Sequence, residues 1–133
     1  GLAFGTLRLD GSLAFTDARA RGSGAAAALD GKRPSQTPRW AASGTLAWRP
    51  ATGTVVSTTL RHTGAQFEDD LETDVLPAAT TLDAYARIAL TDRLGLVLRA
   101  ENLTDTEVVT RNQGGSIDLG APRTLWAGLE WGL

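Results

Sequence analysis

Large apolar side chains recur at every second position in the last ten residues of the chain, "TLWAGLEWGL". They are Leu125, Ala127, Leu129, Trp131 and Leu133. A period of two is that of a β-strand, whose successive side chains point to opposite faces. This feature constrains the fold, because one side of the final strand must lie against something other than bulk water.

Five earlier segments show the same alternation. In the first of them, Leu7, Leu9 and Leu13 share one face, while Arg8 and Asp10 share the other. The five segments are residues 6–19, 38–50, 54–62, 81–91 and 93–102. Each is about ten residues long, the length with which a tilted strand crosses a bilayer. The sequence therefore predicts an all-β, antiparallel transmembrane β-barrel segment of about six strands.

The apolar faces mix Ala and Gly with Leu. A soluble β-sandwich fills its core with bulky, interlocking side chains, whereas fluid lipid tails fit any apolar outline. The composition of these faces favours the membrane barrel, and a soluble β-sandwich binding module stays open as an alternative.

The connections between the expected strands alternate in length. Long connections lie around residues 18–37, 65–79 and 103–121, and short ones at "RPATG" and "TDR". Outer-membrane barrels alternate long extracellular loops with short periplasmic turns, so we expect the C-terminus on the periplasmic side. Trp40 and Trp48 share one face of one strand and would lie roughly 20 Å apart along the barrel axis. They are predicted to mark two aromatic girdles.

Composition excludes several classes of function. The net charge of -2 gives no reason to expect nucleic acid as a partner. The chain has no cysteine and a single histidine, His62, which we expect in surface or girdle packing. No nucleophile–base–acid set is present, so the chain is not expected to be an enzyme, and no cofactor or metal site is predicted.

Two loop segments and one set of charges are candidate binding sites. The acidic residues Glu68, Asp69, Asp70, Glu72 and Asp74 lack the glycine and terminal glutamate of a calcium loop, so a solvated loop is preferred. The segment "RNQGGS" predicts a flexible loop tip. The charged residues expected to face the lumen are Arg8, Arg61, Arg87, Arg99 and Glu101. They either line a ligand path or, as the preferred interpretation, pair with neighbours across the strands.

The C-terminal third of the chain, "LRAENLTDTEVV" followed by "LGAPRTLWAGLEWGL", resembles the end of a TonB-dependent outer-membrane receptor. Such receptors run from the penultimate strand into an Asn-Leu-x-Asp step and reach the last strand through Gly-x-Pro-Arg. The matching residues are Glu101, Asn102, Leu103, Asp105, Gly120, Pro122 and Arg123. Upstream, "LDGKRPSQTPRW" resembles the family's Arg- and Pro-rich entry to an earlier strand, at Arg33, Pro34, Pro38 and Arg39.

The resemblance also gives the final strand a second role. Gly128, Trp131 and Leu133 fit the Gly-x-x-apolar-x-apolar ending by which the outer-membrane assembly machinery recognises unfolded barrel chains. Two positions depart from the family, since the last residue is usually aromatic and the position of Trp126 is commonly polar.

Six strands do not close a barrel, because single-chain barrels of this type begin at eight strands. The resemblance implies that residues 1–133 are the C-terminal part of a 22-stranded barrel that encloses a plug, as one partial domain without the plug itself. Its implied surroundings are outer-membrane lipid of a Gram-negative bacterium, the rest of the barrel, the plug, and TonB acting through a missing N-terminal part. The implied function is uptake of a scarce ligand such as a ferric siderophore, although the ligand cannot be identified from these residues. A small self-assembling porin-like barrel is the other membrane alternative.

Overall fold

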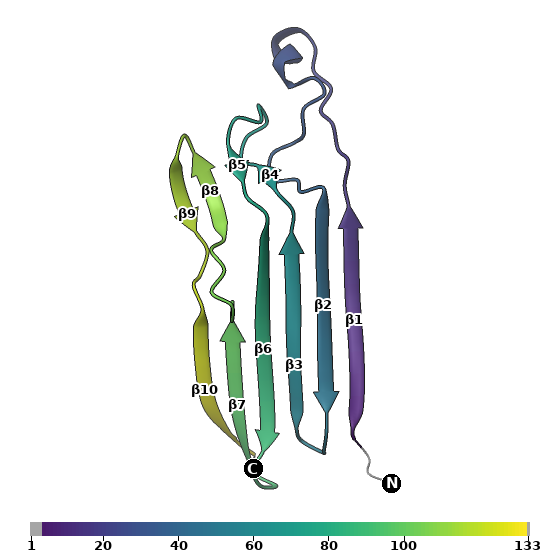
Figure 1. Ribbon diagram of the computed structural model, residues 1–133, viewed down its shortest axis with the longest axis vertical. Helices are drawn as coiled ribbons and strands as arrows, with labels where there is room; N and C mark the ends of the chain where they lie inside the picture. The colour runs from purple at the N-terminus through teal and green to yellow at the C-terminus, as the bar shows by residue number, and fades with distance from the viewer. Residues whose placement is uncertain (1–3, 133) are drawn as a thin grey trace.

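The computed structural model describes residues 4–132 and contains one six-stranded antiparallel sheet. Each strand of this sheet lies beside its neighbours in chain order (Figure 1). The strands are β1 (Thr6–Phe15), β2 (Trp40–Arg49), β3 (Val55–Thr63), β6 (Ala79–Ala89), β7 (Leu94–Glu101) and β10 (Thr124–Trp131). All six correspond to the alternating segments, so the predicted all-β antiparallel architecture is confirmed.

The register of the sheet keeps the apolar residues together on one face. Leu46 of β2 lies opposite Leu9 of β1 and Thr58 of β3. On the other face, Arg99 of β7 lies opposite Tyr85 of β6. Because a shift of one residue would exchange the two faces, this register fixes one apolar and one polar face across all six strands.

No second layer covers the apolar face of the described sheet. Among residues 4–132, Leu76 is the only buried hydrophobic residue, at 2% exposed, whereas Leu9 is 77% exposed. A soluble β-sandwich would bury this face against another sheet, so the sandwich alternative is wrong. Residues 4–132 include no helix with the length and hydropathy of a membrane span.

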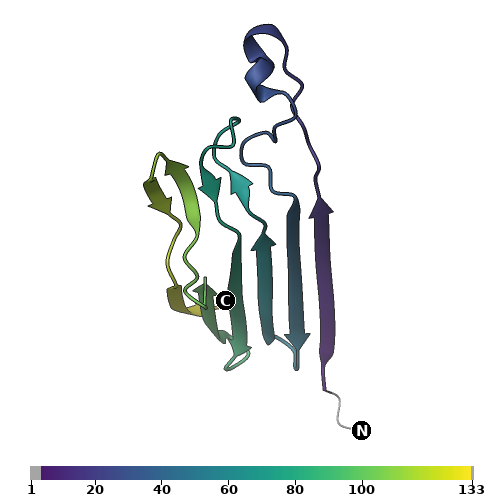
Figure 2. The same cartoon turned by 45° about the horizontal axis from the view of Figure 1, so that its top comes forward.

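The long connections gather at one end of the sheet and the short turns at the other (Figure 1). The first long connection carries the short helix η1 (Gly24–Leu29), which projects beyond the other loops (Figure 2). The second contains β4 (Gln66–Phe67) paired with β5 (Val75–Leu76), and the third contains β8 (Val109–Gln113) paired with β9 (Ser116–Leu119). The end of β10 lies at the short-turn end, as predicted for the periplasmic side.

The segment "RNQGGS" forms the tip of a paired β-hairpin, and the flexibility of this tip stays a prediction. Gln113 lies opposite Ser116, with Gly114 and Gly115 between them at φ 57° and 88°. Two successive residues with positive φ make the turn whose twist matches that of the flanking strands, and glycine adopts this conformation without strain. The two glycines therefore close a β-hairpin.

Candidate functional site

The polar face of the sheet carries four ion pairs, which are the first part of the candidate site. They are Arg8–Asp10 (2.8 Å), Arg61–Asp83, Arg87–Glu130 (2.7 Å) and Arg99–Glu101 (2.7 Å). Each arginine that the sequence places toward the lumen thus contacts a carboxylate. Arg61–Asp83 joins the neighbouring strands β3 and β6, and Arg87–Glu130 joins β6 to β10 across the intervening β7. Arg8–Asp10 and Arg99–Glu101 each lie within one strand, which differs from the predicted pairing across strands.

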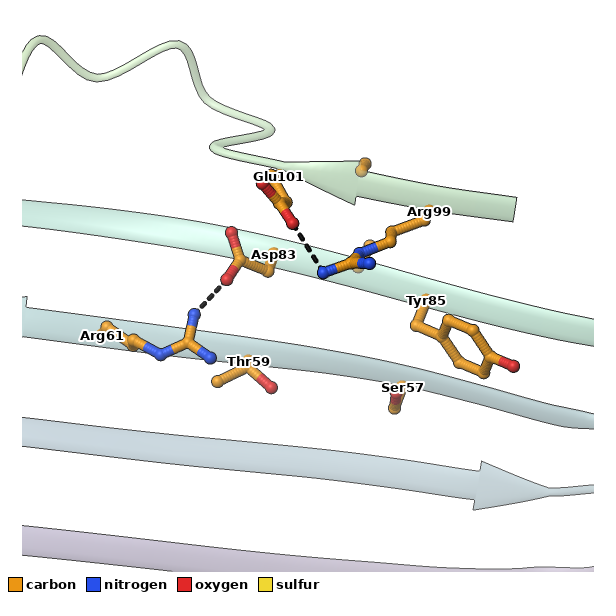
Figure 3. Close-up of a pocket in the computed structure, with 9 residues that line it drawn as sticks. Ser57, Thr59, Arg61, Asp83, Tyr85, Arg99 and Glu101 are labelled. Atoms are coloured by element: carbon orange, nitrogen blue, oxygen red, sulfur yellow. Dashed lines mark hydrogen bonds and ion pairs between the residues drawn. The ribbon is translucent and has the colours of Figure 1, made fainter. Parts of the chain in front are cut away.

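Two of these ion pairs line a shallow cavity of about 180 Å³ on the polar face (Figure 3). Arg61 and Asp83 come from β3 and β6, and Arg99 and Glu101 come from β7. Tyr85 lies on the same wall. The cavity presents hydrogen-bonding and charged groups of both signs, so it suits a polar surface or solute.

Tyr85, Arg99 and Trp126 form one row across three strands. Arg99 lies opposite Tyr85 on one side and opposite Trp126 on the other. The Arg99 guanidinium lies 5.4 Å from the centroid of the Trp126 ring, within the range of a cation–π interaction. The aromatic side chain that departs from the family's polar position therefore covers a charged neighbour.

Asn102 holds the base of the third long connection, and it is the buried polar residue of the described chain, at 6% exposed. Its side-chain amide donates to the carbonyl oxygens of Thr106 (2.8 Å) and Ala121 (3.2 Å), and its Oδ1 accepts from the Thr106 N–H (2.9 Å). Its φ of 49° is left-handed, a conformation that Asn tolerates better than most residues. We call residues 102–106 and 120–123, which this side chain joins, the neck of the third loop.

The remaining residues of the C-terminal motif complete the neck. The Leu103 N–H donates to a carbonyl of β6 (2.7 Å), and Asp105 Oδ1 accepts from the Arg123 N–H (2.9 Å). The Gly120 N–H donates to the Val108 carbonyl (2.8 Å), and Pro122 provides the carbonyl that accepts from the Thr124 hydroxyl (3.0 Å). The structure therefore brings together the two halves of the motif, while Glu101 points to Arg99 on the polar face.

The upstream motif lies where the first loop enters β2. The Arg33 guanidinium lies 5.8 Å from the Phe67 ring, and that of Arg39 lies 5.7 Å from the Phe15 ring. Pro34 and Pro38 lie between these arginines, in a stretch without helix or strand. The two arginines thus attach this stretch to β4 and β1.

One acidic residue of the second loop, Asp69, stabilises the turn within that loop. Asp69 accepts hydrogen bonds from the backbone N–H groups of Leu71 (2.8 Å), Thr73 (3.0 Å) and Asp74 (2.9 Å). Hydrogen bonds to the charged form, led by that from Asp74, lower the pKa of the Asp69 carboxyl below its ordinary value. This carboxylate stabilises the turn between β4 and β5.

Other acidic residues of the second loop reach the two neighbouring loops. Asp70 accepts from the Ser35 N–H (2.7 Å) and Glu72 from the Arg33 N–H (2.8 Å), both in the first loop. Asp74 accepts from the Gly114 N–H (2.9 Å) in the third loop. No group of three or more metal-ligating side chains occurs in the part of the chain that the structure describes. These carboxylates connect loops.

The aromatic residues predicted as girdles lie at opposite ends of β2. Trp40 packs against Phe15 with 4.6 Å between ring centroids and 48° between the ring planes, at the end with the long loops. Trp48 lies at the end with the short turns and donates its Nε1–H to the Phe4 carbonyl (2.8 Å). His62 contacts the Thr80 hydroxyl through Nδ1 (2.8 Å), on the same face as Trp40. This arrangement is compatible with two aromatic girdles, which remain a prediction.

The residues of the predicted assembly signal lie in β10. Gly128 and Trp131 are part of the strand, and Trp131 is exposed on the apolar face. Leu133 lies outside the described residues. The role of this ending in assembly stays a prediction.

A single sheet with one apolar face, one face of paired charges and long loops at one end defines a segment of an outer-membrane β-barrel. Residues 1–103 match the family described as "TonB dependent receptor-like, beta-barrel", and the chain belongs to this family. Membership places it in the outer membrane of a Gram-negative bacterium. No curated protein matches the chain.

Solved structures of three receptors show the same fold. The chain superposes on BauA, the ferric preacinetobactin receptor of Acinetobacter baumannii, with 24% identity and a TM-score of 0.75. The siderophore receptor PiuA of the same organism has 16% sequence identity to the chain and a TM-score of 0.78. The ferric-catecholate import receptor Fiu of E. coli K12 has 18% sequence identity and a TM-score of 0.71. In each case 94% of this chain is covered, but only 18% or 19% of the receptor. The chain thus spans about a fifth of the length of these receptors.

Proposed function

We propose that the chain forms the last six strands of a receptor barrel that imports a scarce ligand, such as a ferric siderophore, with energy relayed by TonB. The observation that carries this proposal is the six-stranded sheet, which has unpaired edges at β1 and β10. A barrel removes exposed edges only by closing. The strands that close it, together with the plug, would come from the rest of the receptor.

Several features support a role in transport. The apolar face suits lipid, the polar face suits the lumen, and the interconnected loops lie where a ligand would enter. The three similar solved structures are a ferric preacinetobactin receptor, a siderophore receptor and a ferric-catecholate import receptor. Family members are transporters, and the chain's single histidine and absent cysteine supply no catalytic set, so we propose no enzymatic activity.

Specificity would come from the three long loops and from parts of the receptor beyond this chain. TonB would act through the N-terminal part, and the outer-membrane assembly machinery would act on β10. No nucleic acid is proposed as a partner, because the net charge of the chain is -2.

The test is uptake of radioactive iron complexed with different siderophores by cells that carry or lack the coding segment of this chain. We expect loss of uptake of one siderophore class on deletion, restored by the intact gene and abolished by a protonophore. Unchanged uptake of every iron complex would contradict the proposed ligand class.

The self-assembling barrel is the second candidate, because β1 and β10 of different copies have free edges that can pair. It predicts an oligomer of fixed size in detergent and passive diffusion of sugars into liposomes. Uptake that depends on the protonmotive force, without such an oligomer, would decide for the receptor.

A further inference from the structure

The two carboxylate oxygens of Asp83 contact different parts of the chain. Oδ2 pairs with the Arg61 guanidinium of β3 (Figure 3), and Oδ1 accepts the backbone N–H of Asn102 at 2.9 Å. The Asp83 side chain is 26% exposed, whereas that of Arg61 is 58% exposed. Arg61 is therefore the lumen-facing end of this arrangement, and Asp83 lies closer to the wall.

Asn102 is the other end of the arrangement. Its buried side chain joins Thr106 to Ala121 and so holds both sides of the neck of the third loop. The Asp83 carboxylate is the acceptor for its backbone N–H. A buried N–H that loses its acceptor carries a desolvation cost, so the placement of Asn102 depends on where the Asp83 carboxylate points.

Arg61 lines three cavities on the polar face. It lines the cavity of about 180 Å³ and two further cavities of about 340 and 370 Å³ toward the loops. The other charged groups that line these cavities are Asp83, Arg99 and Glu101, and Arg99 already pairs with Glu101. A group that enters the lumen at this height therefore meets the Arg61 guanidinium.

We propose that Arg61, Asp83 and Asn102 form a bridge that couples the inner wall of the barrel to the neck of the third loop. The ion pair with Arg61 holds the Asp83 carboxylate in one orientation, in which Oδ1 faces Asn102. When Arg61 is withdrawn, the carboxylate regains rotamer freedom and occupies its bond to Asn102 less often. An anionic group that competes with Asp83 for Arg61 thus loosens the third loop.

The bridge rests on the proposed function only in requiring that β3 and β6 form part of a barrel wall. Its test is the mobility of a spin label in the third loop, measured in isolated outer membranes without ligand. The chain has no native cysteine, so a Gln113→Cys substitution gives the label a single position within it. A Leu71→Cys label in the second loop serves as the matched control site.

We expect Asp83→Ala to increase the mobility of the label at position 113 most, because it removes both contacts. Arg61→Ala should increase the mobility of this label by a smaller amount, and Arg61→Lys should give a mobility closer to that of the native chain. Arg87→Ala, which breaks an ion pair at the short-turn end, should leave it unchanged.

A purely structural role for Asp83 would give a change with Asp83→Ala but none with Arg61→Ala, and that result overturns the bridge. An equal change with Arg87→Ala, or at the label on position 71, would indicate general loosening and would also overturn it. No change with any of these variants would show that Asp83 does not hold the neck. The label mobility is measured without ligand, so a failure of the proposed siderophore uptake is distinguishable from a failure of the bridge.

Discussion

The sheet and the loop layer above it are held together in different ways. In the sheet, regular backbone ladders join the strands, while the large apolar side chains are exposed or half-buried. In the loop layer, side-chain carboxylates and an amide bind backbone groups, and the buried Leu76 and Asn102 lie there or at its base. The sheet thus needs lipid to cover its apolar face, whereas the loops carry their own polar cross-links.

The largest effect is expected from a substitution that disrupts the contact of the sheet with lipid. Leu46→Arg places a charge on the apolar face near the middle of β2, and we expect a loss of about 2–4 kcal/mol in the free energy of unfolding in lipid bilayers. Thr45→Arg is the matched control on the polar face, where Asp10 lies opposite. An equal or larger loss for Thr45→Arg, measured by denaturant titration, would reverse the assignment of the faces.

The next effect is in the neck of the third loop. Asn102→Ala leaves the Thr106 and Ala121 backbone groups without their partner, and we expect local opening to become easier by about 1–3 kcal/mol. Limited proteolysis between residues 103 and 121 measures this opening. Asn112→Ala, which removes contacts nearer the hairpin tip, should accelerate cleavage less. Equal rates for both variants would argue against the neck as the main anchor.

A smaller effect concerns the bonds between the first and second loops. The double substitution Asp70→Ala and Glu72→Ala removes the acceptors of the Ser35 and Arg33 N–H groups. We expect faster hydrogen exchange at these two amides, equivalent to about 1 kcal/mol for each bond. Glu107→Ala, an exposed change in the third loop, is the control. Unchanged exchange in the double variant would mean that these bonds do not hold the first loop in place.

The smallest expected effect depends on pH. Asp69 has a lowered pKa, so its contribution to the turn is fully present above the ordinary Asp pKa of about 4 and is lost as the pH falls toward the lowered value. The protection of the Leu71 and Thr73 amides, taken relative to their intrinsic exchange rates at each pH, should therefore fall on acidification in the native chain. In Asp69→Asn this dependence should be much weaker, and an unaltered pH profile would exclude Asp69 as the titrating group.

Prediction from sequence succeeded where the signal is local. All six strands and both faces follow from alternation, because a period of two directly reports which side chains share a face. The strands β4 and β5 have two residues each, which is too short for a period to appear. The hairpin of β8 and β9 was missed although Gly114 and Gly115 are adjacent, since its flanking strands do not alternate clearly.

The roles of single residues were harder to predict. The C-terminal motif was identified by resemblance, but the bonds that Asn102 makes depend on how the two halves of the neck meet. The role of Asp83 could not be predicted, because its contacts to Arg61 and Asn102 follow from strand register and lie 22 and 19 positions away in the chain. Opposite charges on neighbouring polar faces were the available signal, and register was needed to use it.

The bonds of the second loop to both of its neighbours have a kinetic consequence. Asp70 and Glu72 reach the first loop and Asp74 reaches the third, so the second loop moves away from both neighbours only when these three hydrogen bonds break. In the proposed receptor, the rate of this movement would be set by the rupture of these bonds.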